Sequence, residues 1–181
     1  MKKAILFFAM LFFAKMAFCQ SDKKISDVFP LKDNFYQCEY ADLKFKVPVS
    51  WGDMTYFDIG KIPVFSFRDY CYWLVLVYWS NHKIETDKEL TWHKDKLKHK
   101  EITDLFEKIK WSKTHSYEIN NLKYYITKGI DKNKRYVKFI STVSPNGHPL
   151  YLFKVSRISS NKKELDNEDF TTIEKSIEFV K

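Results

Sequence analysis

The stretch that decides the fold is 70–79, which reads YCYWLVLVYW and contains only apolar or aromatic residues. Side chains alternate between the two faces of a β-strand, so a strand of this composition is apolar on both. The residues that share a face are Tyr72, Leu74 and Leu76 on one side and Trp73, Val75 and Val77 on the other. Both faces have to be covered, which predicts a central strand with layers above and below it.

Length and composition narrow the class of protein around this strand. The chain has 181 residues and a formal charge of +8; 45% of its residues are hydrophobic, and it has four Gly and five Pro. This length predicts a single domain, too short for an enzyme with separate substrate and nucleotide domains. The hydrophobic content excludes disorder, and so little Gly and Pro excludes collagen-like and linker-dominated chains.

The first nineteen residues are typical of a secretory signal peptide. Two lysines precede an apolar run of 11 residues, Ala4–Ala14, and small residues follow near a cleavage point. About 20 residues are needed to span a bilayer, so we do not expect a transmembrane anchor. We favour cleavage after Cys19, which gives a periplasmic or secreted protein. The alternative is a lipoprotein anchored through Cys19, against which the bulky Phe18 argues.

Removal of the signal peptide lowers the net charge to +5, because 28 basic residues then face 23 acidic ones. Mild basicity fits a weak association with an anionic membrane surface. We expect no nucleic-acid partner, and we attribute most of the lysine content to an AT-rich coding sequence.

The expected mature chain keeps two cysteines, Cys38 and Cys71. In an oxidising compartment an even pair is a candidate disulfide. The alternative is two buried thiols that pack as small hydrophobic groups. Spacing alone does not show whether the two Cα atoms lie within about 7 Å of each other. The sequence contains no C-x-x-C pair, so we expect no zinc site and no other metal or cofactor.

The remaining pattern is strands, a helix, four strands and a helix. Residues 20–34 are polar and contain Pro30, and we expect a flexible lead-in there, followed by a single domain at 35–181. Strands are predicted at 35–40, 43–47, 64–67, 117–119, 122–126, 136–143 and 150–155. A Thr86-x-x-Glu89 capping box begins a predicted helical region that continues through 102–109, as one long helix or as two with a break near His99. A closing helix is predicted at 170–177 with Asn167 as N-cap. The predicted fold is an α/β/α sandwich, with a largely antiparallel central sheet and helices on both faces.

Two short turns are predicted to close hairpins. Asn120-Asn121 lies between two strands, and asparagine tolerates the left-handed conformation that tight turns need. Pro145-Asn146-Gly147 separates the next two strands in the same way.

Spaced landmarks along these elements resemble the PsbP-like superfamily. Phe45-x-Val47-Pro48-x-Ser50-Trp51 is similar to that family's F-x-(I/V/Y)-P-x-x-W entry, and 119–124 is similar to its I-N-G-x-x-Y turn, with Asn121 in place of Gly. The last strand and closing helix match at 147–153 and 170–179. The resemblance implies the α/β/α sandwich named above. It also implies a binding or assembly-supporting protein, since members include an extrinsic photosystem subunit, a Ran-binding protein and effector chaperones.

Motifs that would carry catalysis are missing from the sequence. It has no Walker loop, G-x-S-x-G elbow, dinucleotide fingerprint or H-E-x-x-H. His93 and His99 are six residues apart on the predicted helix, whereas a shared metal needs a spacing of about three or four. We therefore predict solvated helix histidines. Asp166, Glu168 and Asp169 are interpreted as favourable charge at a helix N-terminus.

The candidate partner-binding surface consists of Trp51, Trp92, Trp111, Lys94 and Lys98. Tryptophans are enriched at the energetic centres of interfaces, and lysines beside them suit an acidic partner. The competing interpretations are core packing for the tryptophans and an ordinary solvated face for the lysines. Our hypothesis is an exported, non-catalytic module that engages another envelope protein. The alternatives are an envelope carrier of a lipid or small apolar ligand, and a hydrolytic enzyme.

Overall fold

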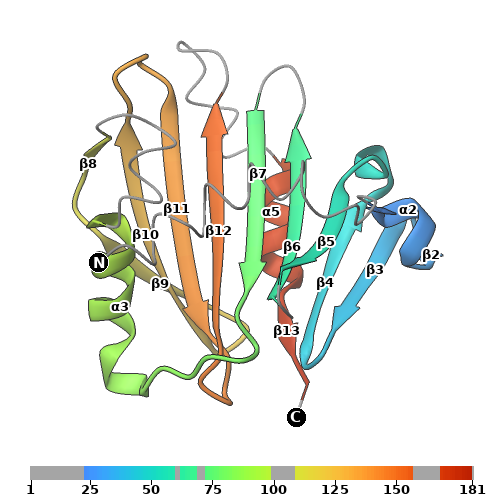
Figure 1. Ribbon diagram of the computed structural model, residues 1–181, viewed down its shortest axis with the longest axis horizontal. Helices are drawn as coiled ribbons and strands as arrows, with labels where there is room; N and C mark the ends of the chain where they lie inside the picture. Colours follow the sequence, from blue (N-terminus) through green and yellow to red (C-terminus); the bar gives the residue numbers. More distant parts are fainter. Residues whose placement is uncertain (1–22, 60–61, 69–71, 99–108, 157–167, 181) are drawn as a thin grey trace.

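Two antiparallel sheets and their flanking helices make up the computed structural model (Figure 1). It describes residues 23–59, 62–68, 72–98, 109–156 and 168–180. Within these ranges the larger sheet has nine strands and the smaller sheet has four. No helix of the described residues is long and apolar enough to cross a membrane.

The bounds of the elements follow the chain. The strands are β1 (Lys23–Lys24), β2 (Leu31–Lys32), β3 (Phe35–Tyr40), β4 (Leu43–Pro48), β5 (Thr55–Ile59), β6 (Ile62–Arg68), β7 (Tyr72–Tyr78), β8 (Lys110–Trp111), β9 (His115–Ile119), β10 (Leu122–Ile130), β11 (Tyr136–Val143), β12 (Pro149–Ser156) and β13 (Glu178–Phe179). The helices are α2 (Ile25–Val28), η1 (Val49–Trp51), η2 (Thr86–Lys88), α3 (Glu89–Lys98) and α5 (Glu168–Ser176).

Residues 72–78 of the apolar stretch form β7, in the interior of the larger sheet. That sheet runs in the order β1-β5-β6-β7-β12-β11-β10-β8, with β9 also paired to β10. Leu74 and Leu76 belong to the core on one face of β7, and Val77 belongs to the core on the other. The prediction of a central strand covered on both faces is therefore confirmed.

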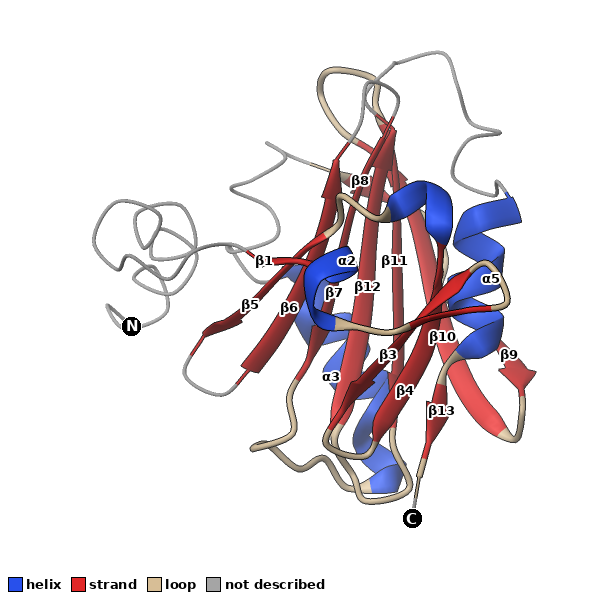
Figure 2. Cartoon of the chain, turned by 90° about the vertical axis from the view of Figure 1, so that its right-hand side faces the viewer, coloured by secondary structure: helices blue, strands red, loops and turns tan. Residues whose placement is uncertain are grey.

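The first face of the larger sheet is covered mainly by strands. The smaller sheet, in the order β13-β4-β3-β2, packs on this face together with α5 (Figure 2). Phe45 of β4 meets Phe65 of β6 edge to face, with ring centroids 4.9 Å apart. Ile173 of α5 and Ile177, the residue that follows the helix, are fully buried in the same core, as their spacing predicts.

The second face carries α3, which buries only His93 and Leu97. The core beneath it contains Val137, Phe139 and Phe153 of the neighbouring strands. Strand pairing is antiparallel throughout the described residues, as expected, but the three-layer prediction holds only in part. A second sheet covers most of the first face, where helices were expected, because β3 and β4 fold over the larger sheet and do not extend it.

Both predicted hairpins are confirmed, and backbone conformation explains them. Asn120 and Asn121 have φ angles of 52° and 60° between β9 and β10. Gly147 has φ 86° between β11 and β12. Non-glycine residues rarely adopt positive φ, but the short polar side chain of asparagine tolerates it, so an Asn pair can close the turn.

The predicted flexible lead-in is wrong for the part that the structure describes. Residues 23–34 contain β1, α2 and β2, and the side chain of Ile25 is fully buried. The backbone N–H of Ile25 donates to the carbonyl of Met54 at 2.8 Å, and β1 pairs with β5. Ile25 anchors this segment together with Phe29, whose ring packs on Tyr56 and Phe65, and composition alone does not reveal this.

The observed helix boundaries agree less well with the predicted ones. The helix predicted from Thr86 opens with the 3-10 turn η2, and the α-helix α3 begins only at Glu89. The side chain of Thr86, the predicted helix 102–109 and the predicted N-cap Asn167 all lie outside the described residues. So do His99, Asp166 and the side chains of Glu168 and Asp169.

Candidate functional site

The five residues of the predicted partner-binding surface do not lie together. Trp51 is only 2% exposed and belongs to the core between the two sheets, so its assignment to a surface is wrong. The turn η1 directs it inward after Pro48, together with Phe45 and Val47 of the same motif. The F-x-V-P-x-S-W landmark is thus a packing motif.

The other four residues lie on or beside α3, and we call them the α3 surface. Trp92 and Trp111 are half-buried and pack against the core of the second face. Lys94 and Lys98 are exposed on the outer side of the helix. The structure thus brings two aromatic rings to the same face of the larger sheet, with two ammonium groups nearby.

A third lysine joins this surface, and the sequence analysis missed its role. Lys96 places its Nζ 4.2 Å from the ring centroid of Trp79 and 5.8 Å from that of Trp92. A cation over an aromatic face is attracted by the ring quadrupole, so the ammonium group of Lys96 links the rings of Trp79 and Trp92. The sequence around Lys96 does not predict this contact, because Trp79 follows β7 and is distant from Lys96 along the chain.

His93 lies beneath α3 and is fully buried, so the prediction of a solvated histidine is wrong for it. Its Nδ1 lies 2.7 Å from the hydroxyl of Ser141, and its Nε2 lies 2.8 Å from the hydroxyl of Thr127. Thr127 in turn shares a hydrogen bond of 2.8 Å with Thr114. Burial, with a smaller contribution from Lys94, lowers the pKa of His93 to about 4. A neutral ring therefore donates with one nitrogen and accepts with the other, and both strands β10 and β11 are tied to α3.

A second buried polar cluster lies under α5 on the first face. Glu174 of α5 forms an ion pair with Lys154, and its Oε1 lies 3.5 Å from the Nζ of Lys138. Lys138 and Lys154 are directly opposite each other on β11 and β12. Their side chains are 8% and 0% exposed, and that of Glu174 is 7% exposed. One carboxylate thus bridges two ammonium groups between sheet and helix.

Two tyrosines complete this cluster. Tyr117 stacks on Tyr124, with centroids 5.3 Å apart, and its hydroxyl lies 3.5 Å from Glu174. The hydroxyl of Tyr124 is buried and has no hydrogen-bond partner among the described residues. Burial, and then the charge of Glu174, raise the pKa of Tyr124, so its hydroxyl stays protonated. The sequence signal for this cluster was a lysine inside each of two apolar strands.

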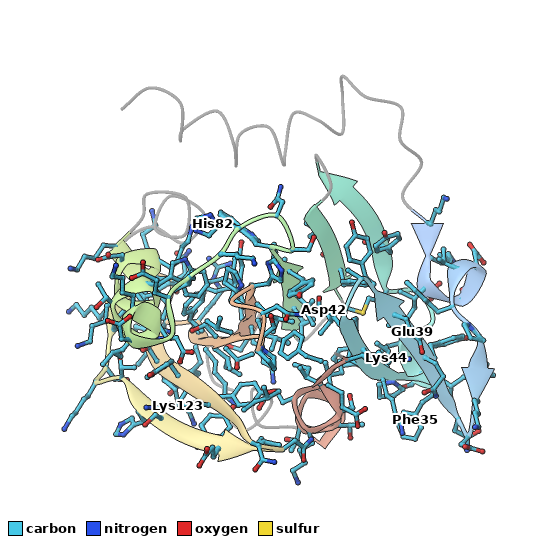
Figure 3. All side chains as sticks on the ribbon, turned by 90° about the horizontal axis from the view of Figure 1, so that it is seen from below. Phe35, Glu39, Asp42, Lys44, His82 and Lys123 are labelled. Carbon is cyan, nitrogen blue, oxygen red and sulfur yellow. The ribbon has the colours of Figure 1, made fainter. Side chains whose placement is uncertain are left out.

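Asp42 joins the ends of the two sheets. Its carboxylate accepts hydrogen bonds from the hydroxyl of Tyr78 and, at 2.9 Å, from the side-chain amide of Asn146. Figure 3 shows Asp42 between the smaller sheet, which carries Glu39 and Lys44, and the loops of the larger sheet. Burial raises the pKa of Tyr78, and its bond to Asp42 adds to this effect. The arrangement is a structural link between hairpins.

Cys38 is a free, buried thiol in the core between the sheets. Burial raises its pKa to about 12, so it remains protonated at neutral pH. The proposed partner, Cys71, lies outside the described residues. In this structure Cys38 packs as a small hydrophobic group, and its disulfide with Cys71 stays a prediction. The described residues contain no group of three or more His, Cys, Asp and Glu that could hold a metal ion.

These features define a small module of two antiparallel sheets, with flanking helices and a half-buried aromatic surface at α3. No protein-family model matches the chain, and no curated protein matches it. Among solved structures, it is similar to the solution structure of cyanobacterial PsbP (CyanoP) from Synechocystis sp. PCC 6803, with a TM-score of 0.55 and 15% identity. The match covers 85% of this chain and 99% of that one. The chain therefore has a PsbP-like fold, as the resemblance predicted.

Proposed function

We propose that this chain is an exported, non-catalytic binding or assembly module of the bacterial cell envelope that engages another envelope protein. The observation that carries the proposal is the PsbP-like fold, which extends over nearly the whole domain. Export is proposed from the signal-like first nineteen residues, with cleavage after Cys19 and lipid anchoring at Cys19 as the alternative.

The placement of the titratable groups supports a non-catalytic role. Acid–base catalysis needs such a group within reach of a substrate. His93 is closed off beneath α3 by two hydroxyl groups, and Glu174 is held between two lysines under α5. Both groups serve to attach a helix to the sheet, which is a structural use of their polarity.

The α3 surface is the part of the described chain best suited to a protein partner. Trp92 and Trp111 offer half-buried rings of the kind that dominate interfaces. Lys94 and Lys98 add positive charge on the outer side of the same helix. Such a combination fits a partner with an apolar spot rimmed by carboxylates.

Close packing of the interior supports a binding module over a carrier. The space between the sheets is filled by large side chains that are almost fully buried, among them Phe45, Trp51, Phe65 and Tyr78. A carrier of a lipid or small apolar ligand needs an apolar cavity of roughly 300 Å³ or more in that position.

Site-specific cross-linking in the source cells tests this proposal. A photoreactive residue at Lys94 or Lys98 should capture one envelope protein in near-stoichiometric yield. The same residue at Lys175, exposed on α5, is the matched control and should capture none of it. A co-purifying lipid, with no protein captured at either helix, would overturn the proposal in favour of the carrier.

A further inference from the structure

At one corner of the larger sheet, β8 pairs with the end of β10, next to the β10–β11 turn (Figure 1). Basic residues are frequent in these segments. We call segments 109–114 and 127–136 the basic corner. They contain a single acidic residue, Asp131. The basic residues are Lys110, Lys113, Lys128, Lys132, Lys134 and Arg135. The basic corner therefore has a net charge of +5, which equals the net charge of the entire expected mature chain.

Strand register places two of these lysines, Lys110 and Lys128, on one face of the sheet. Lys110 of β8 lies directly opposite Ile130 of β10, and the backbone N–H of Ser112 donates to the carbonyl of Lys128 at 2.8 Å. Opposed residues, and residues two apart on a strand, point to the same face of a sheet. Lys110, Lys128 and Ile130 therefore share a face, and the turn that begins at Asp131 continues from it.

The acidic residue of the corner points inward. The side chain of Asp131 is 0% exposed; it accepts from the backbone N–H of Arg135 at 2.8 Å and from its Nε at 2.6 Å. All five lysines are exposed, and Ile130 is 43% exposed beside them. The outer surface of the corner thus combines positive charge with one apolar side chain.

Neighbouring segments of the chain do not change this surplus. Residues 99–108 carry three acidic and two basic side chains, and residues 157–167 carry two acidic and three basic ones. Their charges cancel, so the corner keeps a surplus of five positive charges when both segments are counted in full. The rest of the expected mature chain is neutral in sum, so the basic corner alone accounts for its net charge of +5.

We propose that the basic corner docks on an anionic lipid surface. Five lysines on a strand edge and a turn suit a diffuse layer of charged headgroups, because flexible ammonium groups need no fixed geometry there. Ile130 projects from the same face, where it can enter the headgroup region. Docking on lipid goes beyond the proposed function, because it requires no protein partner. The two proposals share only the assumption that the chain is exported.

Vesicle sedimentation with the expected mature chain, 20–181, tests the inference. The chain should bind vesicles of phosphatidylethanolamine with 30% phosphatidylglycerol at low salt and release them as salt rises. Vesicles of phosphatidylcholine alone should retain none. The variant K110Q/K113Q/K134Q should bind about 100-fold more weakly, since each lysine near such a surface contributes roughly five-fold.

A matched control separates location from net charge. The variant K32Q/K46Q/K175Q removes three exposed lysines from the smaller sheet and α5, and should keep most of the binding. Equal loss in both triple variants would overturn the assignment to the corner. The chain could instead fail to bind anionic vesicles but be retained on immobilised polyglutamate, with the retention lost in K110Q/K113Q/K134Q. That result would overturn lipid docking and assign the basic corner to an acidic protein partner. Neither result bears on cross-linking at α3, so the two proposals fail separately.

Discussion

The attachment of α3 to the sheet can be tested through the pH dependence of folding. His93 is fully buried, and its pKa is lowered from 6.5 to about 4. Between these two pH values the unfolded chain binds a proton that the folded chain excludes. Acidification therefore favours unfolding, and the stability contributed by the neutral ring is complete above pH 6.5 and is lost as the pH falls to about 4.

The size of this effect follows from the width of the window. Each pH unit across it is worth about 1.4 kcal/mol, so His93 should account for about 3 kcal/mol of lost stability between pH 6.5 and 4. Burial disfavours the charged form of the ring. An imidazolium in this position would lose its hydration between Phe139 and Tyr125, whose rings lie 4.9 and 5.9 Å away.

Urea unfolding at pH 7, 6, 5 and 4 measures the effect in the wild type and two variants. At pH 7 His93→Gln should be less stable by about 1–3 kcal/mol, because Ser141 and Thr127 lose a well-placed partner. Because the wild type alone loses about 3 kcal/mol toward pH 4, the difference should vanish there or reverse in favour of His93→Gln. His115→Gln, at an exposed position, should run parallel to the wild type. A gap between His93→Gln and the wild type that stays constant with pH would refute the reasoning.

Three further predictions concern single residues. Glu174→Gln should destabilise the fold by about 3–5 kcal/mol in urea unfolding, because it removes the carboxylate that bridges the buried ammonium groups of Lys138 and Lys154. Glu178→Gln, at an exposed position, is the control and should cost under about 0.5 kcal/mol. In a Cys71→Ser variant, Cys38 should resist a thiol reagent at pH 8 until the chain unfolds, and rapid labelling of the folded chain would contradict its burial. Asn121→Val should cost about 1–2 kcal/mol, and Asn121→Gly should cost nothing, by thermal unfolding; equal effects would contradict the left-handed turn.

Sequence periodicity and turn chemistry predicted most of the strands. The two-sided apolar character of β7 identified a central strand, and Asn120-Asn121 and Gly147 identified two hairpins. These signals are local, because strand alternation and positive φ depend on residues within a few positions of one another. The landmarks shared with PsbP-like proteins are also local spacings of core residues, and the similarity to CyanoP agrees with them.

The candidate site was predicted less well. Trp92, Trp111, Lys94 and Lys98 do lie on or beside α3, but Trp51 is a core residue. Tryptophan is large enough to serve either role, and its sequence neighbours do not distinguish them. The lead-in was misjudged for a related reason, since the one buried side chain of Ile25 outweighs the polarity around it.

By itself, the sequence determined where most strands lie along the chain, which strand is central and where two hairpins turn, since each depends on neighbours along the chain. Only the tertiary structure decided which polar groups are buried. Glu174 meets Lys138 and Lys154, which are 36 and 20 residues away, and His93 meets hydroxyl groups on two strands. Burial of a polar side chain depends on the distant segments that surround it and on the hydrogen bonds they supply, and neither appears in the pattern of a single segment.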